Sequence, residues 1–266
     1  MNTPIDAVRA RAALTDLDIV DAHAHAGPFS LFFIPDPDPA SMVEVMDRCG
    51  VSLALISAHL GVQLDTTAGN EATAAAVSRH PDRFLGYLVV NPWQDPIAEL
   101  ERWEGDQRFR GMKIHPDQHA YPLTGPRYNA VWDFARTTGV PVLTHTWAAS
   151  AYNDLPMLGD VADRHPDVDI IAGHAGGMPS GYDAAIAVAA RFPNVTLEIC
   201  SSRGHGDYVR RMVDEVGSGQ VAFGSDFPFL DLRVSLGRVL FASLASDDLA
   251  AVLGGTMRKL LSKTRS

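Results

Sequence analysis

Leu17-Asp-Ile-Val-Asp21-Ala-His23-Ala-His25 is an apolar run that ends in an acidic residue and two histidines. A β-strand sends residues i and i+2 to the same face, so we expect Asp21, His23 and His25 to point the same way. Neutral imidazole nitrogen is a good ligand for zinc and its first-row neighbours, so two such rings on one strand can bind one metal ion. Short His pairs also arise by chance, and the rest of the chain must decide whether this pair is functional.

The same order of apolar strand, polar loop and helix pattern recurs along the chain. Strands are predicted at residues 18–23, 51–57, 84–90, 111–115, 140–145, 168–174, 195–200 and 221–226. Helices are predicted at 41–49, 70–80, 96–103, 127–138, 155–165, 181–192, 207–216, 231–242 and 246–261. Several strands are runs of Val, Ile and Leu, which is typical of a parallel sheet covered on both faces. Eight such units within 266 residues predict one domain, residues 1–266, with the (β/α)8 TIM-barrel fold. A doubly wound open sheet is less favoured, because no glycine-rich phosphate turn follows the first strand.

Composition limits the classes of partner and the compartment. The net charge is −10 and no run of Lys and Arg is present, which argues against nucleic acid or an anionic membrane surface as the partner. The apolar stretches are strand-sized and the N-terminus has no apolar core, so neither a membrane span nor a secretory signal is predicted. Cys49 and Cys200 have no CxxC partner, and two reduced thiols in a cytoplasmic protein are expected.

Histidines gather where the active site of such a barrel is built. Five of the ten fall at predicted C-terminal strand ends, namely His23, His25, His115, His145 and His174. Buried imidazoles need polar partners, so five at one rim are hard to explain as packing. Three others, His59, His119 and His205, lie in rim loops and are expected to be solvated, although His205 is also a candidate substrate contact.

Asp226 ends the last predicted strand, within Gly224-Ser-Asp226-Phe-Pro228. The last strand of a closed barrel adjoins the first, so Asp226 can face His23 and His25 across the mouth. A simple helix-capping role is the alternative for this carboxylate.

These motifs together resemble the amidohydrolase superfamily, and within it the amidohydrolase-related branch that includes aminocarboxymuconate-semialdehyde decarboxylase-like enzymes. The similarity covers nearly the whole chain. The matching motifs, in order, are Asp21-Ala-His23-Ala-His25, Gly111-Met-Lys113-Ile-His115-Pro116, Thr144-His145-Thr146, Gly173-His174-Ala-Gly176 and Gly224-Ser-Asp226-Phe-Pro228.

The resemblance implies a distorted barrel with a divalent metal ion at its mouth. Carried over by position, the ligands are His23, His25, Asp226 and, as a further ligand, His145. His174 is implied to be a catalytic histidine that polarises the substrate or moves a proton. Such a donor set leaves a position open for water, whose pKa a divalent metal lowers to about 7, and Asp226 could accept its proton. One zinc ion is expected, with manganese or iron as alternatives.

Lys113 leaves the number of metal ions open. In binuclear members of the superfamily a lysine on the fourth strand is carbamylated and bridges two metals, which here would involve Lys113, His145 and His174. The favoured hypothesis is one metal, with Lys113 as an ordinary ammonium group that contacts a substrate anion. His115 should share its face by strand alternation, so it is also expected to contact substrate.

Rim loops supply the remaining candidate substrate contacts. The loop at 27–39 is unusually apolar, and its phenylalanines, Phe32 in particular, could form a lid or wall, or pack against a second subunit. Trp147, Tyr152 and Arg203 lie on later loops, and Arg203 could clamp a carboxylate with its planar fork. Glu198 on the seventh strand has no assigned face.

The expected activity is hydrolysis of a small amide, lactone or ester by a metal-activated water. Non-oxidative decarboxylation of a small unsaturated or aromatic acid is the alternative, because the branch contains both reactions. A catalytically inactive binding protein is disfavoured, because nothing structural requires so costly a polar cluster. A small-molecule substrate and, by family habit, a homodimer are expected.

Overall fold

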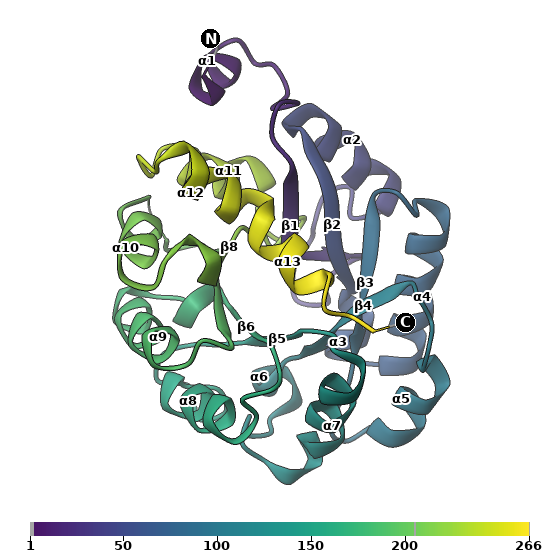
Figure 1. Cartoon of the computed structure of the whole chain (residues 1–266). Coiled ribbons are helices and arrows are strands. Elements are labelled where there is room, and N and C mark those ends of the chain that lie inside the picture. Colours follow the sequence, from purple (N-terminus) through teal and green to yellow (C-terminus); the bar gives the residue numbers. More distant parts are fainter. Residues whose placement is uncertain (1–2, 205, 266) are drawn as a thin grey trace.

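Eight parallel strands form a barrel in the computed structural model, which describes residues 3–204 and 206–265 (Figure 1). The strands pair in sequence order. They are β1 (Ile19–Ala26), β2 (Val51–Ala58), β3 (Phe84–Val89), β4 (Phe109–Ile114), β5 (Val142–His145), β6 (Ile170–Gly173), β7 (Val195–Glu198) and β8 (Val221–Ala222). The predicted (β/α)8 barrel is therefore confirmed.

The segment that follows β8 joins the last strand to the first. The backbone N–H of Ala22 donates to the oxygen of Phe223 at 2.9 Å, and that of His25 donates to Phe227 at 2.7 Å. In the other direction, the N–H of Asp226 donates to His23 at 2.7 Å. These bonds bring the end of β1 beside the residues that follow β8, as the position of Asp226 in the sequence predicted.

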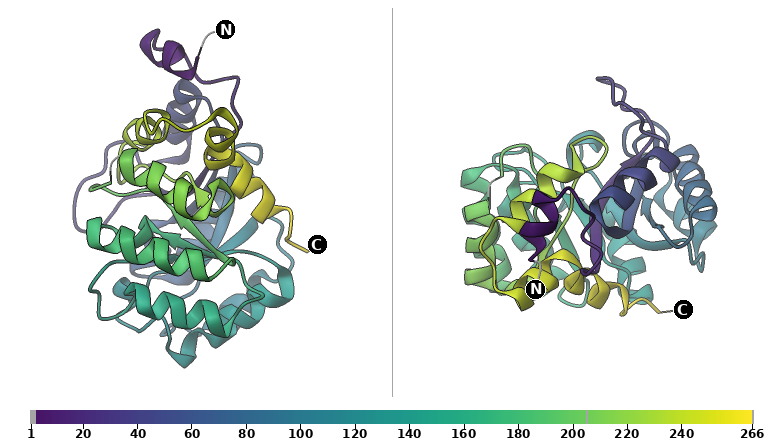
Figure 2. Two further views of the ribbon diagram at one scale, coloured as in Figure 1. Left: turned by 60° about the vertical axis from the view of Figure 1, so that its left-hand side comes forward. Right: turned by 90° about the horizontal axis from the view of Figure 1, so that it is seen from above.

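Helices surround the barrel, and Figure 2 shows α8, α9 and α10 side by side along its outside. The longer helices lie close to the predicted ranges. They are α2 (Pro39–Cys49), α4 (Thr66–Arg79), α5 (Pro96–Trp103), α7 (Asn129–Thr138), α8 (Leu155–Arg164), α9 (Pro179–Arg191), α10 (Gly206–Val216) and α11 (Leu232–Leu240). The predicted last helix is divided into α12 (Ser246–Ala250), a π-helical turn (Ala251–Gly255) and α13 (Thr256–Leu261).

Three short helices were not predicted from the sequence. They are α1 (Pro4–Arg9), α3 (His59–Gln63) and α6 (Pro116–His119). A helix of four to six residues is too short to form by itself, so its existence depends on the contacts around it and leaves little periodic pattern in the sequence.

The inside of the barrel is apolar at the end away from the mouth. Val20, Leu55, Tyr87 and Leu143 belong to one buried cluster, together with Met257 and its neighbours from α13. Figure 1 shows α13 lying across this end of the barrel. The helix thus covers the bottom of the barrel, and the cavity described below opens at the opposite end.

Strand β1 contains a bulge that changes the predicted orientation of Asp21. The register with β2 shifts between Asp21 and Ala24. The Asp21 carboxylate accepts hydrogen bonds from the backbone N–H and the hydroxyl of Ser225, whereas His23 and His25 line the cavity at the mouth. The expectation that all three side chains point the same way is therefore wrong, because a bulge breaks the alternation of a strand and re-aims its side chains.

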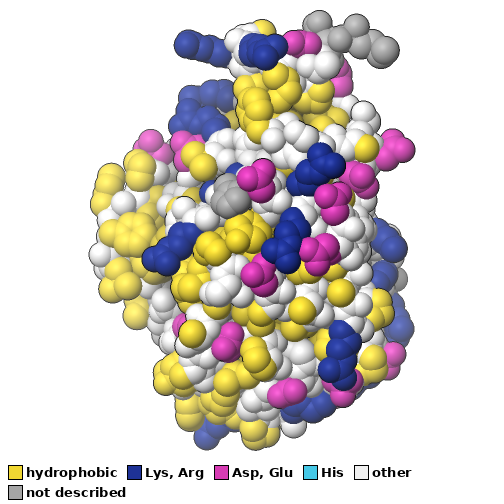
Figure 3. Space-filling view, turned by 90° about the vertical axis from the view of Figure 1, so that its left-hand side faces the viewer, with side chains coloured by type: hydrophobic (Ala, Val, Ile, Leu, Met, Phe, Trp, Pro, Cys, Tyr) yellow, Lys and Arg dark blue, Asp and Glu magenta, His cyan; other side chains and the backbone are white. Residues whose placement is uncertain are grey.

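Charges of both signs are mixed on the face shown in Figure 3, where Lys and Arg alternate with Asp and Glu. Hydrophobic side chains gather at the left of that view. In the described part of the chain, no helix has the length and apolar character that crossing a bilayer requires.

Candidate functional site

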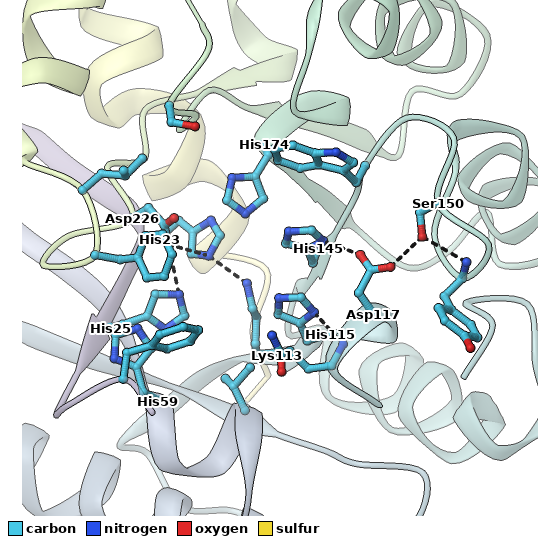
Figure 4. A pocket seen from close by; sticks show the side chains of 18 of the residues that line it. His23, His25, His59, Lys113, His115, Asp117, His145, Ser150, His174 and Asp226 are labelled. Carbon is cyan, nitrogen blue, oxygen red and sulfur yellow. Dashed lines mark hydrogen bonds and ion pairs between the residues drawn. The ribbon is translucent and has the colours of Figure 1, made fainter. Parts of the chain in front are cut away.

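A cavity of about 610 Å³ opens at the C-terminal ends of the strands. Most of the predicted site residues line it. They are Trp147 and seven residues labelled in Figure 4, namely His23, His25, Lys113, His115, His145, His174 and Asp226.

Asp226 faces the two histidines of β1. Its Oδ1 lies 3.2 Å from Nε2 of His25 and 3.8 Å from Nε2 of His23. Two ligand atoms bound at about 2.0–2.1 Å to one tetrahedral ion are about 3.3 Å apart. The spacing and the chemistry of these three donors therefore fit one divalent metal ion.

The back of the His23 ring is fixed by a carboxylate. Its Nδ1 lies 2.7 Å from Oε2 of Glu198, and its Nε2 lies 2.8 Å from Nζ of Lys113. The ammonium group can only donate, so Nε2 carries a lone pair and Nδ1 carries the proton. A carboxylate behind a histidine in this way orients the ring and makes it a stronger metal ligand.

Two further imidazoles have an oxygen atom beside Nδ1. Nδ1 of His145 lies 3.1 Å from Oδ2 of Asp117, and Nδ1 of His174 lies 3.1 Å from the backbone oxygen of Cys200. The Cys200 oxygen can only accept a hydrogen bond, so His174 has Nδ1–H and a free lone pair on Nε2. Nδ1 of His145 lies between the Asp117 carboxylate and the amide nitrogen of Asn153, which is 3.0 Å away. Figure 4 shows Asp117 on the far side of His145 from His23.

The fourth metal ligand is not decided by distance alone. Ligand atoms of His23, His174, Cys200 and Asp226 all lie within 4.8 Å of one another, whereas His145 forms such a group with His115 and Asp117. The His174 ring centroid is 5.0 Å from that of His23 and 4.6 Å from that of His145. His145 as a ligand and His174 as the proton-moving residue therefore stay predictions.

From the sequence, the face of the strand on which Glu198 lies could not be assigned. In the structure Glu198 is buried at this site and accepts several hydrogen bonds. Besides His23, it accepts the backbone N–H of His174 at 3.1 Å and both the N–H and the thiol of Cys200. A Cβ at Gly224 would lie 2.1 Å from Oε1 of Glu198, so the carboxylate fits only because this residue is glycine. Cys200, expected to be an ordinary thiol, thus belongs to the framework of the site.

Two of the candidate site residues have strained backbones. His174 has φ of 66° and Asp226 has φ of 61°, a region that residues other than glycine rarely occupy. Such strain persists only where surrounding contacts hold it, and it clusters at functional sites.

Burial sets the charge state of these groups. It lowers the pKa of His174 to about 4 and that of His145 below its usual value, so both rings are neutral at pH 7. Burial acts to raise the pKa of Asp226, but the hydrogen bond with His25 and the surrounding imidazoles hold it well below the ordinary value. The site thus offers neutral nitrogen donors and one carboxylate, the forms in which these groups bind a metal ion.

Lys113 supplies the positive charge of the cavity. Among the described residues that line the cavity, no other lysine or arginine is present. The side chain is buried, and burial lowers its pKa to about 8. It is therefore a cationic group at neutral pH that can pair with an anionic substrate.

Aromatic rings form the walls. Phe29, Trp147 and Phe229 line the cavity, and Trp147 lies nearly parallel to His145 with the ring centroids 5.8 Å apart. Phe32 does not line the cavity but packs on Phe29 and Phe229, with ring centroids 5.0 and 4.8 Å apart, respectively. Its side chain is 46% exposed. The apolar loop therefore reaches the cavity through Phe29, and the substrate contact expected of Phe32 stays a prediction.

The other residues singled out in the rim loops do not all lie where the sequence predicted. Arg203 is exposed and is not among the described residues that line the cavity, so its role as a carboxylate clamp stays a prediction. His205 lies outside the described residues. His59 and His119, expected to be solvated, are instead buried, at 2% and 3% exposure. His59 begins α3 and stacks on His25, and His119 contacts the hydroxyl of Tyr128, because two unpredicted short helices carry them inward.

We expect Glu198→Gln to weaken metal binding by about 10- to 100-fold, because partners behind a metal-binding histidine typically contribute that much. The amide cannot accept the hydrogen bonds of His23 and Cys200 as the carboxylate does. Zinc affinity measured by competition with a chelator tests this, with Cys200→Ser as the matched control that keeps Glu198. An unchanged affinity in Glu198→Gln would mean that Glu198 does not orient His23.

Comparison with known protein families gives one match over most of the chain. Residues 20–263 match the amidohydrolase family. The match begins inside β1 and ends beyond α13, so it covers every strand and all the metal-ligand candidates.

Individual relatives are more distant. A gamma-resorcylate decarboxylase of Rhizobium radiobacter is 26% identical over 214 residues, which cover 60% of this chain and 64% of that protein. The chain thus spans less than two thirds of that relative's length. RutD of Caulobacter segnis, provisionally named a carbamate hydrolase, is 28% identical over 200 residues, covering 68% of this chain and 67% of that protein.

A solved structure shares the fold. A dihydroxybenzoic acid decarboxylase of Polaromonas sp. JS666, with bound manganese and the inhibitor 2-nitroresorcinol, superposes with a TM-score of 0.69. It is 17% identical, and the similarity covers 94% of this chain and 98% of that one.

Proposed function

Because this chain belongs to the amidohydrolase family, we propose that it is a metal-dependent decarboxylase of a small aromatic carboxylic acid. The observation that supports this proposal most strongly is Lys113, a buried cation in an aromatic-walled cavity beside three metal-ligand candidates. The sequence favoured hydrolysis and kept decarboxylation as the alternative. The decarboxylases among the relatives favour that alternative.

The residues that would hold the metal ion are His23, His25, Asp226 and His145. A divalent zinc or manganese ion at this position would act as a Lewis acid on substrate oxygen atoms. Neutral imidazoles with one carboxylate suit either metal, and the manganese-bound structure neighbour supports manganese as a candidate.

The side chains of the cavity position the substrate. Lys113 pairs with an anionic oxygen of the substrate through a charge-assisted hydrogen bond. Phe29, Trp147 and Phe229 enclose the ring and limit the access of water. An ion pair is stronger in such a water-poor space than in bulk solvent.

His174 handles the proton in this proposal. In decarboxylation the bond between the ring carbon and the carboxylate breaks, carbon dioxide leaves, and the ring carbon takes up one proton. The Nε2 lone pair of His174 can accept a proton, for example from a substrate hydroxyl, and deliver it to that carbon. Its Nδ1 stays bonded to the Cys200 oxygen throughout, which keeps the ring in place.

The test is product analysis with manganese-loaded and zinc-loaded protein in ¹⁸O-labelled water. The substrates are 2,6-dihydroxybenzoate, its positional isomers and, in parallel, small aryl carbamates. We expect one carbon dioxide and one phenol per acid consumed, with no ¹⁸O in the phenol. Hydrolysis of the carbamates, with no carbon dioxide from any hydroxybenzoate, would replace decarboxylation by the hydrolysis that the RutD similarity supports as second candidate.

A further inference from the structure

His115 differs from His23 and His174 in what its Nδ1 contacts. The backbone N–H of Gln118 donates to this nitrogen at 3.3 Å, because the His115 side chain caps the first turn of α6. In contrast, Nδ1 of His23 and Nδ1 of His174 each face an oxygen acceptor.

This contact fixes the tautomer of His115. A backbone amide can only donate, so Nδ1 of His115 must carry a lone pair and no proton. The ring is then neutral, and its single proton is on Nε2. His115 therefore has the opposite tautomer to His23 and His174.

An Nε2–H group cannot bind a metal ion. Although His115, Asp117 and His145 have ligand atoms within 4.8 Å of one another, the tautomer excludes His115 from a metal site there. Within the described part of the chain, the hydrogen bond of the His115 side chain is the one that Nδ1 accepts from Gln118, and the ring lines the cavity. The cavity thus contains a neutral N–H donor that the protein leaves unused.

The position of this donor relative to Lys113 is fixed by the backbone. His115 follows Lys113 by two residues at the end of β4, and both line the cavity. The His115 ring stacks on His145 with centroids 4.1 Å apart, which limits its rotation (Figure 4). Lys113 on β4 and His115 directly after this strand are therefore donors, whereas the rings of His23 and His174 offer lone pairs.

We infer that His115 is a specificity-determining residue, whose Nε2–H donates a hydrogen bond to an oxygen atom of the substrate next to the oxygen that Lys113 binds. The substrate class is then a small aromatic ring with two adjacent oxygen acceptors, such as the two carboxylate oxygens or a carboxylate and a phenolic oxygen. An ammonium or amino substituent at that position would be rejected, because its N–H groups would face the Nε2–H donor of His115 without an acceptor between them. The aromatic nature of the substrate rests on the proposed function. The tautomer of His115 does not depend on it.

The matched variants are His115→Gln and His115→Phe. Glutamine places an N–H donor near the position of Nε2, and phenylalanine keeps the stacked ring without a donor. Both lose the cap of α6, so the difference between them isolates the donor. The probe is 2-nitroresorcinol, whose adjacent nitro and hydroxyl oxygens match the predicted pair, and its dissociation constant is measured with the zinc-loaded protein.

We expect His115→Phe to weaken binding of this probe by about tenfold or more, and His115→Gln by less than about threefold. Both variants should keep the zinc content of the wild type. In the wild type, ¹⁵N–¹H correlation spectra of zinc-loaded, histidine-labelled protein should show the His115 proton on Nε2, assigned by its loss in His115→Gln. A proton on Nδ1, loss of zinc in His115→Phe, or equal binding by all three proteins would overturn the inference. Failure of decarboxylation alone would leave the tautomer and the binding result standing.

Discussion

His174→Ala is expected to keep the bound metal ion and to lose about three orders of magnitude in kcat, because proton transfer by a positioned side chain typically contributes 10²–10⁴-fold. The Nε2 of His174 is the proposed carrier of the proton to the ring carbon. Its backbone geometry is unusual, with φ of 66°, and alanine can keep the contact of its N–H with Glu198. The measurement is kcat for the acid that releases carbon dioxide, together with metal content per chain.

His145→Ala is the matched comparison, because its ring lies next to that of His174 with centroids 4.6 Å apart. We expect this variant to lose most of its metal, since His145 is the proposed further ligand and Asp117, 3.1 Å from its Nδ1, holds the ring in place. The opposite result, metal lost from His174→Ala and kept in His145→Ala, would exchange the two roles. It would agree with the tight group that His23, His174, Cys200 and Asp226 form.

Lys113→Met is expected to lower kcat/KM for a carboxylate substrate by about 10- to 100-fold, because a hydrogen bond to a charged group contributes about 1.5–3 kcal/mol. Methionine fills a similar volume without the charge in a fully buried position. Steady-state kinetics with the acid report the contribution of the Lys113 charge. Binding of an uncharged analogue reports the contribution of the side-chain volume. Binding of the uncharged analogue should change by less than about threefold, because it makes no use of the charge.

The same variant decides the number of metal ions. Nζ of Lys113 lies 2.8 Å from Nε2 of His23, so the ammonium group competes with a metal ion for that lone pair. With one metal ion, Lys113→Met should bind zinc as tightly as the wild type or more tightly. If Lys113 were a carbamylated bridge between two ions, the variant would lose metal, and the one-metal proposal would be contradicted.

The barrel was predictable because its determinants are local and repeated. Each strand is an apolar run and each longer helix has a periodic face, so the eight units are visible in the sequence. The ends of the strands then placed His23, His145, His174 and Asp226 at one rim without further information.

The parts that sequence could not show depend on contacts between distant segments. A bulge near Asp21 leaves no mark in the residue pattern, yet it decides which of three alternating polar residues enter the cavity. The burial of His59 depends on α3, a helix of five residues that forms against its surroundings.

The oxygen partners of the imidazoles were the least predictable feature. Glu198 and Cys200 are two residues apart, a spacing that sends both side chains of a regular strand to one face, and the sequence does not say which face is inside. Gly224 in another segment makes room for the carboxylate, and only the folded chain brings the two together. The motif His115-Pro-Asp117 contained a hint of the Asp117–His145 pair, because a second polar residue beside a rim histidine is a common orienting partner.

Metal content per chain tests the central claim most directly. Protein purified without added metal is analysed by plasma mass spectrometry, beside His23→Ala with its fold checked by circular dichroism. We predict about one zinc or manganese ion per wild-type chain, held as in other sites of histidine and carboxylate ligands, and less than about a tenth of that in the variant. A wild-type chain that stays free of metal after dialysis against zinc and manganese would contradict the account.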